Sequence, residues 1–111
     1  MTALRVVMVT APADRATDLA RTLVSEGLAA CVNVLPGATS IYRWDGAVCE
    51  DPESLLVVKT TAEGMGALTA RILTIHPYRV PEVLALPVDS TTGNPAYLQW
   101  VASSVGGGKA E

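Results

Sequence analysis

Charged residues, aromatic residues and cysteines are all scarce in this 111-residue chain. Only 17% of the residues are charged, phenylalanine is absent, and the eight lysines and arginines are scattered singly within a net charge of −3. Nucleic-acid binding requires a clustered basic face, which this pattern does not provide. No apolar run approaches the roughly 20 residues of a membrane-spanning helix. We therefore expect neither a nucleic-acid partner nor a membrane span.

The start of the chain lacks the pattern of a secretory signal. Residues 1–10 contain one arginine and an apolar stretch that is shorter than the seven or so residues of a signal core. We therefore expect a cytoplasmic protein. The two cysteines, Cys31 and Cys49, are then expected to stay free, because thiols remain reduced in that compartment.

Common catalytic and metal-binding motifs are also missing. The chain has no GxSxG nucleophile elbow, and His76 is the only histidine that could serve as a base. The Gly106–Lys109 segment lacks a following Ser or Thr, so it is not a phosphate loop. No CxxC, HxxxH or histidine pair occurs, although a closed transition-metal site requires three or four ligands. We predict a non-enzymatic protein in which a metal is held across subunits or binds weakly at the surface.

The most informative feature that is present is one overlong β-hairpin. Apolar and β-branched residues run on both sides of Asp45-Gly46, a dipeptide typical of tight two-residue turns, so Leu28–Trp44 folds back along Ala47–Thr60. At about 3.3 Å per residue each arm spans roughly 45 Å. A domain of this length has a radius of gyration of only about 13 Å. Part of the hairpin must therefore extend beyond its own domain.

The outer part of this hairpin carries apolar side chains, namely Ile41, Tyr42, Trp44 and Val48. They would remain in water unless another chain covered them. Half of the residues are hydrophobic and the mean hydropathy is +0.34, which also favours buried subunit contacts. We predict an obligate oligomer with Ile41, Tyr42 and Trp44 at its interface.

The hairpin register separates the two cysteines. Pairing across the turn sets Tyr42 opposite Cys49 and places Cys31 near Thr60, about 35 Å further along the strands. A disulfide requires Cα atoms within about 7 Å of each other. An intrachain bridge is therefore excluded.

End signals and apolar periodicity define the other elements. Gly27 stands where a left-handed helix cap belongs, Thr60 and Glu63 match a capping box, and Asn94 is placed to cap a final helix. The predicted strands and helices, in chain order, are Leu4–Thr10, Pro12–Gly27, Leu28–Trp44, Ala47–Thr60, Thr60–His76, an edge strand at Val83–Val88, and a helix from Asn94.

This βαββαβ order with a short terminal helix predicts an α+β, ferredoxin-like domain over residues 1–105, followed by a disordered tail at 106–111. Right-handed crossovers place the first strand and the second hairpin arm in the middle of an antiparallel sheet, with both main helices on one face. Residues 6–9 and 55–58 are apolar at consecutive positions, so the other face is apolar too. We expect neighbouring protomers to cover that face, and three-fold closure suits a domain of this shape.

Four segments of the chain resemble the CutA family of divalent-cation tolerance proteins. They are AACVNVLPGATSIYRWDG at 29–46, LLVVKT at 55–60, HPYRVPEVLALPV at 76–88 and GNPAYLQWV at 93–101. The resemblance implies a ferredoxin-like homotrimer, similar in fold to the PII signalling proteins, with a role in metal tolerance and copper binding. Two positions depart from the family pattern: Arg79 replaces a usual acidic residue, and Cys49 stands where an acidic or polar residue is more common.

The candidate metal ligands are Cys31, His76 and Glu82, which would bind copper or another divalent cation weakly. His76 and Cys31 each have a structural alternative that we consider the more common one. A histidine in the last turn of a helix interacts favourably with the helix dipole, and a buried free cysteine usually acts as a small hydrophobic residue. Cys49 lies beside Glu50, Asp51 and Glu53, where copper or zinc could bind, but a solvated edge that discourages strand pairing is the favoured interpretation.

A second hypothesis concerns a small anionic ligand rather than a metal. Lys59, Tyr78 and Arg79 could line clefts between subunits of a PII-like signalling or interaction platform. A protein partner of unknown identity would then read out the bound state. The absence of a glycine-rich phosphate loop argues against a nucleotide as the ligand.

Overall fold

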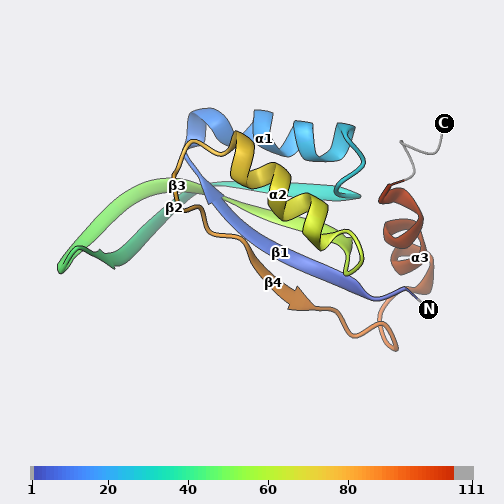
Figure 1. Ribbon diagram of the computed structural model, residues 1–111. Helices are drawn as coiled ribbons and strands as arrows, with labels where there is room; N and C mark the ends of the chain where they lie inside the picture. Colours follow the sequence, from blue (N-terminus) through green and yellow to red (C-terminus); the bar gives the residue numbers. More distant parts are fainter. Residues whose placement is uncertain (1, 107–111) are drawn as a thin grey trace.

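The computed structural model describes residues 2–106 of the protein (Figure 1). Its elements, in chain order, are β1 (Leu4–Ala11), α1 (Ala13–Ser25), β2 (Cys31–Trp44), β3 (Ala47–Thr61), α2 (Met65–Ile75), β4 (Leu84–Pro87) and α3 (Pro95–Ser104). The predicted βαββαβ order and the terminal helix are confirmed. Most of the predicted tail, residues 107–111, lies outside the described residues. Its first residue, Gly106, donates its backbone N–H to the carbonyl of Gly27 at 2.7 Å.

The four strands form one antiparallel sheet in the order β2-β3-β1-β4. The two strands predicted at the centre, β1 and β3, are therefore the central strands. Figure 1 shows α1 and α2 lying side by side over one face of the sheet, whereas α3 lies beyond its end, near the N-terminus. β4 is a short edge strand, as Pro87 within the predicted strand indicated.

Alternation of burial along the central strands separates two faces of the sheet. The side chains that point toward α1 and α2 are fully buried and include Val7, Val9, Leu56 and Val58. The alternating positions Val6, Met8, Leu55 and Val57 are only half-buried. The helix-free face is therefore apolar, as predicted. The side chains of β4 next to Met8 and Val6 on this face are exposed to solvent: Leu84 is 60% exposed and Leu86 50%.

The long hairpin has the predicted turn and register. Asp45 and Gly46 both adopt positive φ angles, 50° and 78°, and Trp44 pairs with Ala47. A register shift between Leu35 and Ala38 bends the arm where Pro36 and Gly37 interrupt it. The molecule measures 44 × 31 × 22 Å with a radius of gyration of 14.7 Å, because the end of the β2–β3 hairpin extends beyond the domain (Figure 1).

The helix ends agree with the sequence signals except at the start of α2. Gly27, with φ 74°, closes α1 by donating its N–H to the carbonyl of Val24 at 3.0 Å. The capping box predicted at Thr60 and Glu63 is wrong, because the Thr60 hydroxyl donates instead to the carbonyl of Leu28 at 2.9 Å. α2 therefore begins after Gly64, whose N–H is accepted by the Thr61 hydroxyl at 3.0 Å.

The end of α2 and the start of α3 lie where the sequence placed them. His76 is the residue that follows the last turn of α2, and its extended backbone leads into Pro77. The side chain of Asn94 accepts the backbone N–H of Ala96 at 3.1 Å, with Pro95 in the first helical position. Within residues 2–106, no helix is both long and apolar enough to cross a membrane.

Candidate functional site

Two polar clusters contain most of the side chains that the sequence singled out. The first, the junction cluster, consists of Glu53, His76, Tyr78 and Glu82 and lies where the long hairpin leaves the domain. The second, the thiol–lysine cluster, consists of Cys31, Asn33, Lys59 and Tyr97 at the other end of β2. Each cluster supports a different chemistry.

His76 is buried in the junction cluster, with 7% of its surface exposed. Its Nδ1 accepts the backbone N–H of Tyr78 at 3.1 Å, so this nitrogen must carry the lone pair. Its Nε2 lies 2.8 Å from the carbonyl oxygen of Thr10 and therefore donates its proton there. Both ring nitrogens of the neutral imidazole are thus engaged within the fold, which leaves no free lone pair for a metal ion.

Tyr78 connects His76 to the root of the hairpin. Its ring lies 4.8 Å from the imidazole, centroid to centroid, and its hydroxyl donates to Oε2 of Glu53 at 2.7 Å. Burial, followed by this hydrogen bond, raises the pKa of Tyr78 to about 12. Glu53 is 7% exposed, and burial together with its negative charge raises the pKa of the neighbouring Glu82. The Glu82 carboxyl is therefore protonated more readily than an ordinary glutamate.

The thiol–lysine cluster lies on the helix-free face of the sheet. Cys31 on β2 is the direct cross-strand partner of Lys59 on β3, and Nζ of Lys59 lies 3.8 Å from the sulfur of Cys31. The same ammonium group donates to Oδ1 of Asn33. Burial, with a contribution from Cys31, raises the pKa of the Tyr97 phenol on α3. Both cysteines are free, as predicted.

One copy of the chain does not bring the three candidate metal ligands together. Cys31 pairs with Lys59, whereas the partner of His76, Thr10, pairs with Leu55. Four residues of β3 separate the two positions, roughly 13 Å. Among residues 2–106, no group of three or more His, Cys, Asp or Glu side chains is placed to hold a metal ion. The side chains of a single copy therefore do not fit a closed copper or zinc site.

The candidate anion ligands are also separated within one copy. Tyr78 reaches Glu53, which lies six residues along β3 from Lys59, a separation of roughly 20 Å. Arg79 is exposed. A cleft that contains Lys59, Tyr78 and Arg79 would therefore require residues from two copies.

The predicted interface residues lie exposed on the long hairpin. Ile41 is 66% exposed, Tyr42 42% and Trp44 56%, and the opposing Val48 is 69% exposed. The Tyr42 hydroxyl donates to Oδ2 of Asp51 across the two arms, and this hydrogen bond is the main reason that the pKa of Tyr42 is raised to about 12. The apolar part of the hairpin thus remains available for contact with another chain.

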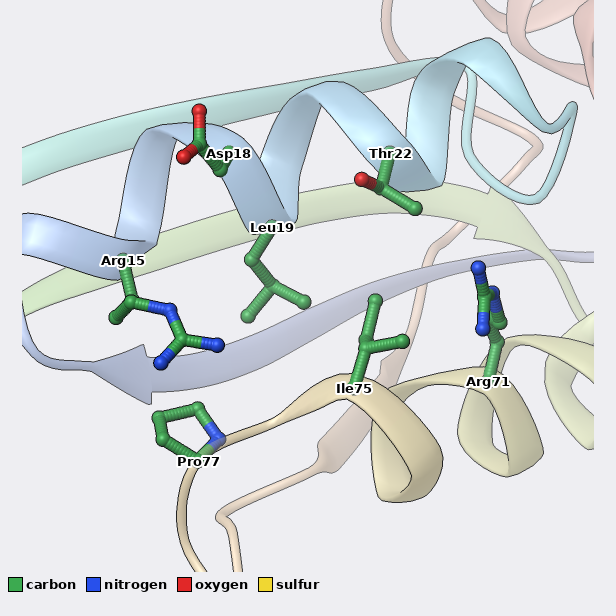
Figure 2. Close-up of a pocket in the computed structure, with 7 residues that line it drawn as sticks. All are labelled: Arg15, Asp18, Leu19, Thr22, Arg71, Ile75 and Pro77. Carbon is green, nitrogen blue, oxygen red and sulfur yellow. The ribbon is translucent and has the colours of Figure 1, made fainter.

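A shallow groove between α1 and α2 contains none of the predicted site residues (Figure 2). Leu19 and Ile75 face each other across it, and Arg15 and Arg71 lie toward its two ends. Its volume is about 140 Å³. The Arg71 guanidinium forms a bidentate salt bridge with the Glu26 carboxylate, with N···O distances of 2.8 and 2.9 Å, so its charge is already compensated. We therefore assign no ligand to this groove.

Sequence reasoning missed three members of the two clusters. Glu53 was expected on a solvated acidic edge, but it is buried, unlike its exposed neighbours Glu50 and Asp51. Asn33 belongs only to a family-like segment, and Tyr97 only to such a segment and to the apolar stripe of the last helix. Period-two alternation with Cys31 places Asn33 on the same face, so it could have been identified from the strand pattern. No local signal links Tyr97 on α3 to Cys31.

The split βαβ order, the four-stranded antiparallel sheet and the overlong β2–β3 hairpin define an α+β protein of the PII-like type. A solved structure described as the PII-like protein CutA from Nostoc, in apo form, matches with a TM-score of 0.86 at 34% identity, over 91% of this chain and 96% of that one. The family model described as "CutA1 divalent ion tolerance protein" matches residues 5–104. The chain therefore belongs to the CutA1 divalent ion tolerance family.

Individual relatives agree with this assignment. The divalent-cation tolerance protein CutA of Thermus thermophilus is 50% identical over 102 residues, which cover 91% of this chain and 97% of the relative. Mouse protein CutA is 49% identical over 94 residues, and the chain spans only 52% of its length. The crystal structure of CutA1 from Oryza sativa matches with a TM-score of 0.89 at 44% identity, over 94% of each chain.

Proposed function

We propose that the protein is a non-enzymatic homotrimer that binds copper or another divalent cation weakly and contributes to metal-ion tolerance in the cytoplasm. Family membership supports the tolerance role. The main support for a metal site shared between copies is that Cys31 lies far from His76 and Glu82 within one copy. The hairpin that extends beyond the domain could bring the ligands of two copies together. Ligands from more than one copy are then needed to hold one ion.

The trimer itself is supported by exposed apolar surface at two places. The outer hairpin exposes Ile41 and Trp44, and the helix-free face ends in the open strand β4, where Leu84 is 60% exposed. An unpaired strand edge beside an apolar surface is a ready acceptor for another chain. Contact between the hairpin of one copy and the sheet of the next would cover both surfaces and close around a three-fold axis.

Cys31 is the ligand we favour within the proposed site. Its thiol is the soft donor that copper prefers, and it is partly exposed on the helix-free face. Glu82 supplies a carboxylate from the junction cluster; the residue as a whole is exposed, although its carboxyl group is partly desolvated. His76 is the third proposed ligand. It can bind the ion only if one ring nitrogen gives up its hydrogen bond to Thr10 or Tyr78.

Titration calorimetry with copper and with zinc tests this function on the trimer that sedimentation identifies. We expect Cys31→Ser to weaken copper binding at least tenfold, while the matched thiol variant Cys49→Ser binds like the wild type. His76→Gln tests the histidine directly: weaker copper binding would show that a ring nitrogen gives up its hydrogen bond to Thr10 or Tyr78 to hold the ion, and unchanged binding would remove His76 from the set. A monomeric protein, or equal copper affinity in wild type and Cys31→Ser, would contradict the proposal.

A second candidate function is a PII-like signalling platform that binds a small anion between copies. It is favoured by the presence of Lys59 and Arg79 on a chain whose fold resembles a PII-like protein. A thermal-shift screen with phosphate and with di- and tricarboxylates distinguishes it from metal binding. Stabilisation by an anion that is lost in Lys59→Gln, with no response to copper or zinc, would favour this function over the first.

A further inference from the structure

Cys31 and Lys59 form a cross-strand pair of a thiol and a primary amine. They face each other directly in the β2–β3 register, and Nζ lies 3.8 Å from the sulfur. The Asn33 amide oxygen accepts a hydrogen bond from the same Nζ and so holds the lysine side chain over this end of β2. A flexible lysine can close the remaining distance without moving the backbone, because both residues are anchored in one sheet.

No other thiol of the same chain can reach Cys31. Cys49 pairs with Tyr42, and the 11 residues of β2 from Cys31 to Tyr42 separate the two thiols by roughly 36 Å. Oxidised Cys31 therefore has no resolving cysteine within its own chain. The amine of Lys59 lies 3.8 Å from its sulfur. Sulfenic acids that lack a thiol partner can condense with nitrogen instead.

We propose that Cys31 and Lys59 form a reversible sulfenamide cross-link in response to hydrogen peroxide. Peroxide first oxidises the thiol to a sulfenic acid and is itself reduced to water. The lysine, after it releases one proton to solvent, attacks the sulfur; an N–S bond forms, the S–O bond breaks, and the oxygen leaves as water with one amine proton. The protein loses two hydrogen atoms in total. Two equivalents of a thiol reductant restore the cysteine and the amine and become a disulfide.

The chemistry would change the helix-free face in two ways. It removes the positive charge of Lys59 and the free thiol of Cys31 from adjacent positions. It also joins the start of β2 to β3 covalently, at the end of the hairpin farthest from its turn. The modification does not require a metal ion, but it consumes the thiol that the proposed function assigns to copper.

The test uses the full-length Cys49→Ser protein, in which competing disulfides through Cys49 are impossible. The protein is treated with hydrogen peroxide at mildly alkaline pH, and its denatured mass is measured. We expect a decrease of about 2 Da at the monomer mass, reversed by a thiol reductant. The decrease should be absent in Cys31→Ser and in Lys59→Arg, which keeps the charge but lacks a primary amine. Circular dichroism checks that each variant is folded.

Tryptic mapping locates the cross-link. Trypsin does not cleave after a blocked lysine, so oxidation should abolish cleavage at Lys59 and join residues 22–43 to residues 44–71. Lys59 is one of only two lysines in the chain, and the other, Lys109, lies outside the described residues. Unchanged cleavage at Lys59, a covalent dimer mass, or products that only gain about 16 or 32 Da as sulfenic or sulfinic acid would overturn the proposal.

Discussion

The Tyr78 hydroxyl donates a 2.7 Å hydrogen bond to Oε2 of Glu53, a residue that lies 25 positions earlier in the chain. This bond ties the segment between α2 and β4 to the point where the long hairpin leaves the domain. Glu53 is 7% exposed, so its carboxylate depends on such a donor. The bond therefore fixes both the hairpin root and the position of His76, against which the Tyr78 ring packs.

Replacement of Tyr78 by phenylalanine should lower the free energy of unfolding by about 1–2 kcal/mol, because it leaves the buried Glu53 carboxylate without its donor. Chemical denaturation at a fixed protein concentration measures this loss. Thr91→Val is the matched control, since it removes an exposed hydroxyl–carboxylate hydrogen bond to Asp89 outside the proposed interface. We expect no measurable loss there. Equal losses in the two variants would contradict a special role for the buried pair.

Replacement of His76 by alanine should lower the free energy of unfolding by about 2–4 kcal/mol, because it leaves the Thr10 carbonyl and the Tyr78 N–H unpaired and opens a cavity. His76→Gln should recover part of this loss, since its amide can donate and accept. Thermal or chemical unfolding of the two variants measures the difference. Wild-type stability in His76→Ala would show that the two hydrogen bonds of the imidazole contribute nothing.

A charged residue on the outer hairpin should dissociate the proposed trimer. Ile41 is 66% exposed in a single copy, and Ile41→Glu would place a carboxylate in the predicted interface. Analytical ultracentrifugation at low micromolar concentration should show a shift toward the monomer. Leu73→Glu is the matched control, because Leu73 is 56% exposed on α2, away from the hairpin. An Ile41→Glu protein that sediments like the wild type would remove this residue from the interface.

Glu82 should reduce stability at neutral pH. Burial and the charge of Glu53 raise its folded pKa, so the folded state binds a proton more tightly than the unfolded state does. The stability that this proton supplies is present at acid pH and is lost as the pH rises through the raised pKa. Glu82→Gln should therefore be slightly more stable than wild type at pH 7, with the difference vanishing near pH 4. Glu63→Gln, at an exposed position, provides the charge-matched control. A Glu82→Gln variant that is no more stable than wild type at pH 7 would contradict this role.

The hairpin could be predicted because its signals are local. Asp45-Gly46 supplies the turn. Pairing that proceeds outward from Trp44 and Ala47 then sets every partner as far as Ala38, beyond which the register shifts. The start of α2 could not be predicted in the same way. Thr60 has the chemistry of a capping residue, but it lies within β3 and bonds to Leu28, 32 residues away.

The sequence could identify most residues of the candidate site, but it could not predict which of them contact each other. His76 was favoured as a structural residue from its position after a helix, and its two hydrogen bonds agree with that interpretation. Glu53 was expected in solvent with Glu50 and Asp51. It is buried instead, and its hydrogen-bond donor Tyr78 comes from a segment that no local pattern links to the hairpin.

The sequence alone determined the order of elements, the turn, the register of the outer hairpin and the separation of Cys31 from Cys49. These follow from backbone preferences and side-chain periodicity over a few neighbouring residues. Only the tertiary structure decided that Lys59 lies beside Cys31, that Glu53 is buried under Tyr78, and that both nitrogens of His76 are engaged. Such contacts depend on where distant segments pack, because a side chain's partner is set by the sheet and the loops around it.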